Sequence, residues 1–205
     1  MDPKALLKFM ALAEKLKCNL RHSWTSSTRQ ESVAEHSWRL CVFAWLVRKD
    51  FPDHDMEKVL LMCLFHDLGE AVTGDIPTFL KTQEHEDDET KAVNSILNLL
   101  DEHDLKVLLD LFDEMRRQDT KEAKLFKALD KLEAVIQHNE APISTWIPLE
   151  YELNLTHGDE ETKGIPVLKD LRNEIRNTTL KIISENREDL NQRSKRNGKG
   201  NVFEN

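Results

Sequence analysis

Hydrophobic residues recur along this chain at the spacing of helix faces. The stretch "KALLKFMALAEKLK" follows Asp2-Pro3 and carries apolar positions three and four residues apart, which predicts a first helix that ends near Lys17. The next stretch, "CNLRHSWTSSTRQE", breaks this spacing and is expected to be a loop. Ser32, with Glu35 three residues later, forms a capping box and predicts the start of a second helix, "VAEHSWRLCVFAWLVRK".

The third helical segment is the most apolar part of the chain. After a break at residues 51–53, the run "MEKVLLMCLFHDLGEAV" is apolar on nearly every face, which predicts a central buried helix that ends before a turn at 73–77. Further helices are expected over about residues 84–100, 104–115, 120–138 and 167–186.

Residues 139–166 differ from the rest because prolines and glycines interrupt them repeatedly. Together with an acidic cluster, this composition predicts a long loop with one short helix, which would serve as a lid or as a partner surface. Residues 187–205 are polar and contain several glycines, which predicts a disordered tail.

No repeat and no convincing strand alternation occurs along the chain, so the pattern predicts an all-α fold. A length of 205 residues suits one domain with a sizeable core. We therefore expect a single domain over residues 1–186, with its core at about 16–138, a loop or lid at 139–166 and a C-terminal helix.

Composition narrows the class of protein. Hydrophobic residues make up 39% and charged residues 33%, which is typical of a globular domain, and no window approaches the roughly 20 apolar residues of a membrane span. There is no signal-peptide pattern, and the three scattered cysteines (Cys18, Cys41 and Cys63) indicate free thiols and a cytoplasmic location. The net charge of −9 argues against nucleic-acid binding but permits a nucleotide substrate in a local basic or metal site.

Residues 66–70, "HDLGE", place three ionisable side chains at the end of the most apolar segment. His66 and Glu70 are four residues apart, so a continuous helix would present them on one face, with Asp67 about a quarter-turn away. Burying all three is costly unless each has a partner. Taken singly, His66 also suits a core imidazole bonded to a carbonyl, and Glu70 suits a solvated helix end.

Two other residues have no link to this group from spacing alone. His36 lies on the apolar half of the second predicted helix, a position typical of a core histidine. Asp130 flanks the apolar stripe of "LFKALDKLEAVIQ", a position typical of a solvated carboxylate.

The order of the motifs supplies the link. "ESVAEHS" is followed by "HDLGEAVTGDIP", with 30 residues from His36 to His66, and an aspartate stands in a later helix. This order resembles the HD-domain metal-dependent phosphohydrolases, and it is more narrowly similar to the 5′-deoxynucleotidase branch, which hydrolyses deoxyribonucleoside monophosphates. The resemblance covers about residues 16–137 and implies an HD-domain helical bundle.

The resemblance also implies that His36, His66, Asp67 and Asp130 bind one divalent metal ion, which makes Asp67 part of the catalytic group. Two imidazoles and two carboxylates suit Co²⁺, Mn²⁺, Fe²⁺, Ni²⁺ or Zn²⁺, and Mg²⁺ is a further option. Such an ion would bind phosphate and acidify a water molecule. Glu70 is implied to position the attacking water or to transfer a proton, and its alternative role is to orient a ligand of the metal.

Three residues are implied to bind the substrate. Arg21 would contact the phosphate, because its paired N–H groups match phosphate oxygens, and Trp24 would lie against the sugar. Asp75, in "TGD", would accept a hydrogen bond from the sugar 3′-hydroxyl. The alternatives are a surface arginine, a tryptophan that packs the loop onto the core, and an aspartate that caps a helix turn.

The leading hypothesis is therefore a phosphohydrolase that releases phosphate from nucleoside 5′-monophosphates, and the resemblance further implies a homodimer. A deoxynucleoside triphosphate triphosphohydrolase on the same scaffold is the nearest alternative, and extra basic residues facing the metal would favour it. A non-catalytic nucleotide-binding module is a further alternative, although the complete ligand set with Glu70 argues against it. Contact of the basic tail "RSKRNGKG" with nucleic acid would be weak and sensitive to salt.

Overall fold

A computed structural model of the chain describes residues 2–186, and the tail expected over 187–205 lies outside the described residues. In chain order the elements are α1 (Pro3–Lys15), β1 (Leu20–Trp24), β2 (Gln30–Ser32), α2 (Val33–Val47), η1 (Arg48–Asp50), α3 (Met56–Phe65), α4 (Glu70–Thr73), η2 (Thr78–Leu80), α5 (Gln83–Leu97), α6 (Glu102–Arg117), α7 (Lys121–Glu140), η3 (Ile143–Thr145), α8 (Glu150–Thr156), α9 (Asp159–Thr162) and α10 (Pro166–Glu185). The predicted all-α class is confirmed, with one small hairpin added.

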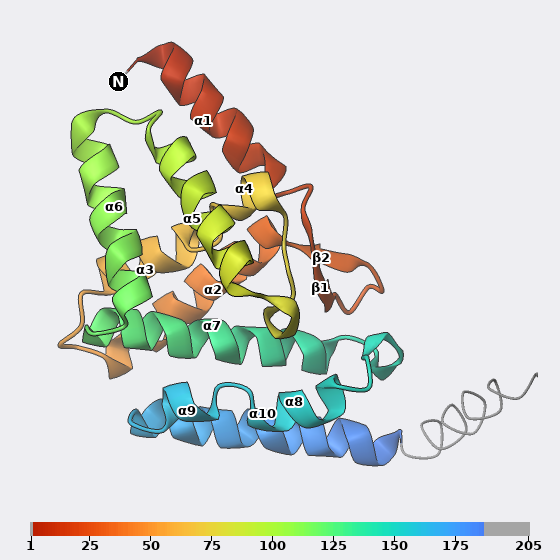
Figure 1. The fold of residues 1–205 in the computed structure, drawn as a ribbon. Coiled ribbons are helices and arrows are strands. Elements are labelled where there is room, and N and C mark those ends of the chain that lie inside the picture. Colours follow the sequence, from red (N-terminus) through yellow and green to blue (C-terminus); the bar gives the residue numbers. More distant parts are fainter. Residues whose placement is uncertain (1, 187–205) are drawn as a thin grey trace, which may run out of the picture.

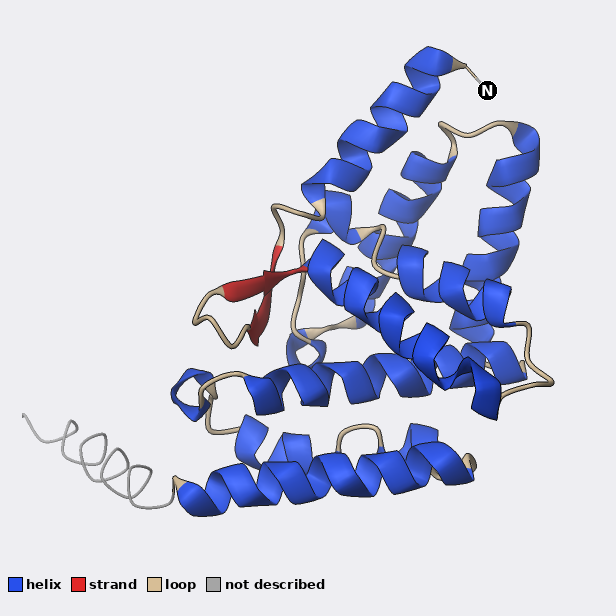
Figure 2. Ribbon diagram, turned by 180° about the vertical axis from the view of Figure 1, so that it is seen from behind, coloured by secondary structure: helices blue, strands red, loops and turns tan. Residues whose placement is uncertain are grey.

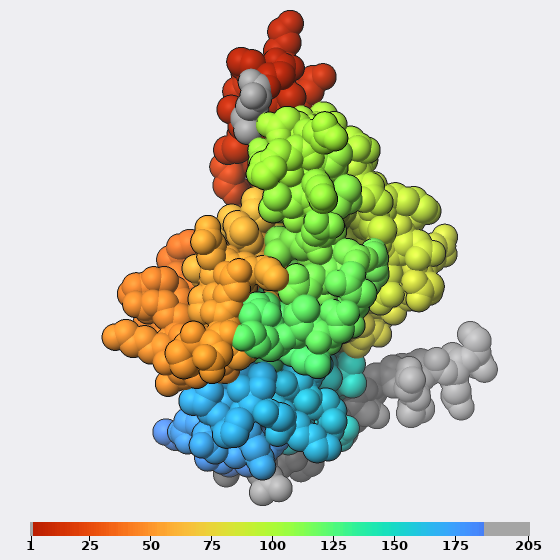
Figure 3. Space-filling model, turned by 90° about the vertical axis from the view of Figure 1, so that its left-hand side faces the viewer, coloured from red at the N-terminus to blue at the C-terminus, as the bar shows by residue number. Residues whose placement is uncertain are grey.

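The long helix α7 lies at the centre of the fold (Figure 1). It contacts α2 and α3 on one side and α9 and α10 on the other. Leu125, Leu129 and Leu132 of α7 are fully buried, as the apolar stripe predicts. Figure 3 shows the C-terminal helices, in blue, as a lower layer beneath the rest of the molecule. Within residues 2–186, every helix is too short or too polar to cross a membrane.

The second helix begins where the capping box predicts. The Ser32 hydroxyl accepts a hydrogen bond from the Glu35 backbone N–H, and the Glu35 carboxylate accepts one from the Ser32 backbone N–H. This cap fixes the first turn of α2. His36 directly follows Glu35 and is fully buried. The cap therefore places His36 at a defined depth in the core.

The segment expected to be a loop before α2 is instead an antiparallel hairpin of β1 and β2 (Figure 2). Leu20 pairs with Ser32 and Trp24 pairs with Gln30, with an irregular register between these pairs. Thr28 takes a left-handed conformation (φ 64°) in the connecting turn. The two strands have only five and three residues, so they are too short to show a clear alternation in the sequence.

The prediction of one continuous helix through "HDLGE" is wrong. Helix α3 ends at Phe65, residues 66–69 form a turn, and α4 begins at Glu70. Gly69 lies in this turn, at a point where a Cβ atom would lie 2.7 Å from Glu89 Cγ on α5. The glycine therefore lets this turn pack directly against α5. Burial is also less complete than predicted, since Leu64 is 49% exposed.

Residues 139–166 contain more helix than predicted, namely η3, α8 and α9. Gly158 separates α8 from α9 with a left-handed backbone (φ 86°), which an L-residue rarely adopts. Trp146, Glu150 and Asn154 of this segment are buried. The repeated prolines and glycines thus divide the segment into short helices that pack on the core.

Candidate active site

The structure brings together the four residues expected to bind a metal. His36 comes from α2, His66 and Asp67 from the turn after α3, and Asp130 from α7. His36 Nε2 lies 3.3 Å from Asp130 Oδ1, and His66 Nε2 lies 3.0 Å from Asp67 Oδ2 and 3.9 Å from Asp130 Oδ1. The centroids of the two imidazole rings are 5.3 Å apart. Residues 94 positions apart in the chain therefore converge on one point.

Both imidazoles are oriented by their Nδ1 atoms. His36 Nδ1 donates to Glu133 Oε2 at 2.5 Å, and His66 Nδ1 donates to the Cys63 carbonyl at 3.0 Å. The two Nε2 atoms are buried, and neither has a hydrogen-bond partner. A histidine that ligates a metal is commonly held in this way, with Nδ1–H on a carboxylate or carbonyl and Nε2 free for the ion.

The donor atoms of His36, His66 and Asp67 all lie within 4.8 Å of one another, a spacing that could hold a metal ion. Two overlapping groups among the described residues have the same property, and they are Glu31–His36–Glu133 and Asp67–Glu70–Glu89. Only the first group combines two imidazoles whose Nε2 atoms have no hydrogen-bond partner, so its donor set fits a divalent ion best.

The electrostatics of this cluster keep both aspartates ionised. Burial raises the pKa of Asp67, but the charges of His66, His36 and Arg21 outweigh it and hold that pKa well below its usual range. Burial likewise opposes ionisation of Asp130, whose pKa is nevertheless held well below its usual range by Lys127, His36 and His66. Two ionised carboxylates beside two imidazoles are the donors that a dication requires.

The pKa of His36 is raised, in contrast to the lowered pKa values of the two aspartates. Burial and the charge of Arg21 lower its pKa, but the carboxylates of Glu133 and Asp130 raise it further, to about 10. Without a bound cation His36 is therefore protonated at neutral pH, and a cation that binds at Nε2 has to displace this proton.

Glu70 is buried (2% exposed) at the start of α4, and its backbone carbonyl accepts a hydrogen bond from the Asn19 amide. One carboxylate oxygen lies 3.8 Å from Lys81 Nζ, and the other has no hydrogen-bond partner. Burial raises the pKa of Glu70 to about 10, with a further contribution from the charges of Asp67 and Asp75. Although the helix breaks before Glu70, its side chain still lines the same cavity as His66.

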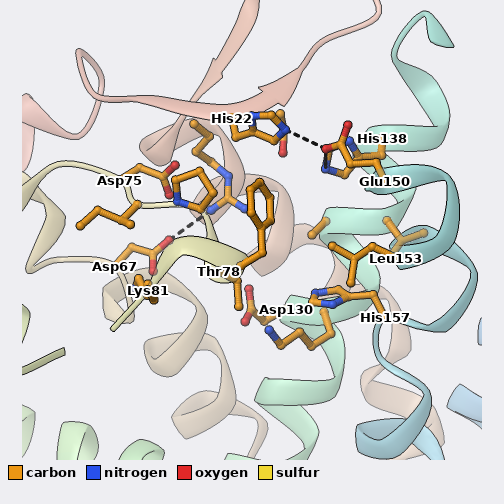
Figure 4. A pocket seen from close by; sticks show the side chains of 18 of the residues that line it. His22, Asp67, Asp75, Thr78, Lys81, Asp130, His138, Glu150, Leu153 and His157 are labelled. Atoms are coloured by element: carbon orange, nitrogen blue, oxygen red, sulfur yellow. Dashed lines mark hydrogen bonds and ion pairs between the residues drawn. The ribbon is translucent and has the colours of Figure 1, made fainter. Parts of the chain in front are cut away.

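This cavity has a volume of about 430 Å³ (Figure 4). Its wall includes Arg21, His66, Asp67, Glu70 and Asp130, and it extends to α8. His36 is not part of the wall, because it is fully buried behind it.

Two of the three predicted substrate residues line the cavity. Arg21 lies 3.4 Å from Asp67 Oδ2 and 3.3 Å from Glu31 Oε2, which leaves its guanidinium at the edge of the candidate metal site. Asp75 also lines the cavity. Burial raises the pKa of Asp75, whereas the charge of Arg21 and a hydrogen bond from the His22 backbone N–H lower it. Trp24 does not line it, and the Trp24 backbone carbonyl accepts a hydrogen bond from the Gln137 amide at 2.7 Å.

Sequence reasoning did not select several polar residues of the cavity region. Glu133 is 1% exposed and stands three residues after Asp130 within the apolar stripe of α7, a spacing that could have indicated it. Glu150, in the segment expected to be a loop, is also 1% exposed, and no pattern in that segment predicted its burial.

A model of the HD domain family matches residues 13–182. The chain belongs to the HD domain family. This match confirms the resemblance carried by the "EHS", "HDLGE" and "TGD" motifs, and it extends the family assignment beyond those motifs into α10.

Among characterised HD domain relatives, 5′-deoxynucleotidase HDDC2 of Homo sapiens is 33% identical over 142 residues, which cover 67% of this chain and 68% of that protein. 5′-Deoxynucleotidase YfbR of Escherichia coli is 29% identical over 140 residues, which cover 63% and 70%. The crystal structure of a predicted metal-dependent phosphohydrolase from Magnetospirillum magnetotacticum superposes with a TM-score of 0.73 and is 25% identical, covering 87% of this chain and 93% of that one.

Proposed function

We propose that this HD domain protein is a metal-dependent 5′-deoxynucleotidase, which hydrolyses deoxyribonucleoside 5′-monophosphates to a nucleoside and phosphate. The names of its relatives support the reaction class. The observation that carries the proposal is the pair of buried imidazole Nε2 atoms without hydrogen-bond partners, which converge with two ionised aspartates at the wall of a cavity.

His36, His66, Asp67 and Asp130 would hold one divalent ion, such as Co²⁺, Mn²⁺, Fe²⁺, Ni²⁺, Zn²⁺ or Mg²⁺. When bound, the ion supplies positive charge for the phosphate and lowers the pKa of a bound water. The residues around it orient its ligands, since Glu133 and the Cys63 carbonyl fix the two rings through Nδ1.

Arg21 would bind the phosphate, because its guanidinium already lies at the cavity wall beside Asp67. Asp75 would accept the hydrogen bond of the sugar 3′-hydroxyl from the same wall. Trp24 does not line the cavity, so we propose no contact between Trp24 and the sugar. Asp75 is then the one residue that we propose for the sugar.

Glu70 would orient the attacking water and accept its proton. The side chain is buried and lines the cavity, and one carboxylate oxygen is free for such a contact. Glu70 has to be ionised for this role. A cation held by His36, His66, Asp67 and Asp130 would lower the raised pKa of Glu70. Lys81, at 3.8 Å, acts in the same direction.

A deoxynucleoside triphosphate triphosphohydrolase is the second candidate, because three lysines line the cavity. Lys81 is paired with Glu89 and Lys127 with Asp130, and Lys131 adds a further cation. These cations suit a longer phosphate chain as well as a single phosphate. A non-catalytic nucleotide-binding module is less consistent with a buried Glu70 beside a complete donor set.

The purified protein tests the proposal directly. We expect deoxyribonucleoside monophosphates to yield orthophosphate in the presence of Co²⁺ or Mn²⁺ and to yield none with a chelator. Ribonucleoside monophosphates and deoxynucleoside triphosphates complete the panel. Release of intact triphosphate would select the second candidate, whereas no metal-dependent release from any monophosphate would contradict the proposed function. Light scattering on the same sample tests the homodimer that we propose from the family resemblance.

A further inference from the structure

A second histidine–carboxylate cluster lies on the wall of the same cavity. Glu150, at the start of α8, is 1% exposed. Its Oε1 atom accepts a hydrogen bond from His22 Nε2 at 2.8 Å and lies 3.3 Å from His138 Nε2. Its Oε2 atom accepts a hydrogen bond from the Ile147 backbone N–H at 2.7 Å. Each oxygen of this buried carboxylate therefore accepts a hydrogen bond.

The cluster is separate from the candidate metal site. Figure 4 shows His22, His138 and Glu150 together on one side of the cavity, away from Asp67, which lies on the other side. All four residues line the same cavity. A cavity of about 430 Å³ is large enough for a whole small organic ligand, so a molecule whose phosphate lies beside Arg21 and the candidate metal site can extend toward this second cluster.

The wall around the cluster is aromatic. The ring of Phe79 lies edge-to-face with His22 at 5.6 Å between centroids, and the rings of His22 and His138 are 6.1 Å apart. Val135 and Leu153 line the same cavity and add apolar surface. Flat rings with polar edges, set against apolar side chains, suit a flat aromatic ligand that carries hydrogen-bonding groups.

Glu150 has no strongly basic partner. Within residues 2–186, no lysine or arginine nitrogen lies within 4.0 Å of its oxygens, and its partners are the two imidazoles and one backbone N–H. A buried carboxylate is costly, so it is retained where its hydrogen bonds hold other groups in place. Here those groups are two imidazole rings from elements far apart in the chain, β1 and α7.

We propose that His22 and His138 form the nucleobase subsite of the nucleotide site and that Glu150 is the residue that positions them. In this subsite the imidazole edges bind the base by hydrogen bonds, and the ring of Phe79 packs against it. The inference rests on the proposed function, since the phosphate at the candidate metal site brings the base to this wall.

The test compares substrates with and without a base. The measured quantity is kcat/KM for each of dAMP, dCMP, dGMP and dTMP, divided by kcat/KM for 2-deoxyribose 5-phosphate, which has the sugar and phosphate but no base. The variants are Glu150→Gln, which keeps the shape of the side chain, and His22→Asn. His103→Asn on the exposed surface of α6 is the matched control. Thermal unfolding and metal content establish that each variant is folded and loaded.

For the wild-type protein we expect this ratio to be well above one for at least one of the four bases. Each of the two variants should lower the ratio for that base about tenfold, the value of one hydrogen bond to the base, and His103→Asn should leave it unchanged. An equal loss on both types of substrate would assign Glu150 and His22 to the fold alone and would overturn the subsite.

A wild-type protein that hydrolyses the base-free substrate as well as all four nucleotides would also overturn the subsite, while the proposed function would stand. No release of phosphate from any monophosphate would instead contradict the proposed function, and the subsite with it. The two failures are therefore distinguishable in one set of assays.

Discussion

Two clusters of histidine and carboxylate face the same cavity, and they differ in what their imidazole nitrogens contact. At the first cluster, the buried Nε2 atoms of His36 and His66 lie 3.3 Å and 3.0 Å from the carboxylates of Asp130 and Asp67, yet neither forms a hydrogen bond. At the second, Nε2 of His22 is bonded to Glu150, and Nε2 of His138 lies 3.3 Å from the same carboxylate. A buried polar atom without a hydrogen bond is costly and favours a ligand, whereas His22 is held in place by its own hydrogen bond to Glu150. The first arrangement indicates an ion site and the second a surface for recognition.

The two clusters also differ in their carboxylates. Burial raises the pKa values of Asp67 and Asp130, but the cations around these two carboxylates outweigh it and hold both pKa values well below the usual range. Glu150 has only imidazoles and one backbone N–H within reach. The first cluster therefore keeps two ionised carboxylates beside its imidazoles, which are the donors that a dication requires.

Asp67→Ala should have the largest effect, because it removes one of the two ionised carboxylates of the first cluster, the one that lies 3.0 Å from His66 Nε2. We expect loss of bound metal and a fall of phosphate release to background. Metal content by elemental analysis and phosphate release by a colorimetric assay provide the measurements. Asp110→Ala, at an exposed position on α6, is the matched control and should keep both. Retention of the metal by Asp67→Ala would remove Asp67 from the ligand set.

Glu70→Gln should separate chemistry from metal binding. The glutamine keeps the size of the buried side chain but cannot accept a proton from water, so we expect kcat to fall about 10²- to 10⁴-fold. The metal content should match that of the wild-type protein. A loss of metal as large as in Asp67→Ala would instead make Glu70 a metal ligand, as its place in the group of Asp67, Glu70 and Glu89 allows.

Glu133→Gln tests how the first cluster is held. The carboxylate accepts the Nδ1–H of His36 at 2.5 Å, so its loss should weaken metal affinity about 10- to 100-fold through the orientation of that ring. Calorimetric titration of metal into the apo-protein measures this affinity without reference to activity. Glu174→Gln, exposed on α10, is the control. Unchanged affinity in Glu133→Gln would show that the turn and helices alone orient His36.

His157, on the cavity wall, should make stability depend on pH. Burial, together with the charge of Lys131, lowers its pKa from 6.5 to about 4. The unfolded state therefore binds the proton more tightly, so the contribution to stability is complete above pH 6.5 and is lost as the pH falls toward 4.

For His157→Gln we expect a smaller loss of unfolding free energy between pH 6.5 and 4 than for the wild-type protein. The difference in slope is at most about 1.4 kcal/mol per pH unit. Urea unfolding at several pH values in this window measures it. Parallel curves for the two proteins would show that His157 is protonated in the folded state.

The residues of the first cluster could be named from the sequence only through family resemblance, and the second cluster could not be named at all. The capping box at Ser32 places His36 in the first turn of α2, whereas the apolar stripe of α7 indicated only a solvated position for Asp130. The position of both residues close to His66 depends on contacts between helices, and helical periodicity does not encode these contacts. Family resemblance supplied that information.

The elements that escaped prediction depend on tertiary contacts. Gly69 lies where α5 is too close for a side chain, and the sequence around it gave no sign of this neighbour. The hairpin strands are too short to show alternation in the sequence, and Trp24, at the end of β1, does not line the cavity. Glu150 was missed because a buried carboxylate in a segment rich in proline and glycine has no local signature.

The measurement that tests the central claim most directly is a crystal structure of the Mn²⁺- or Co²⁺-loaded protein, with anomalous difference density collected at the edge of the metal. The account predicts one strong peak bound by His36, His66, Asp67 and Asp130, with Glu70 outside bonding distance. A peak at Glu31 and Glu133, a peak at Glu150, or none at the four residues would contradict it.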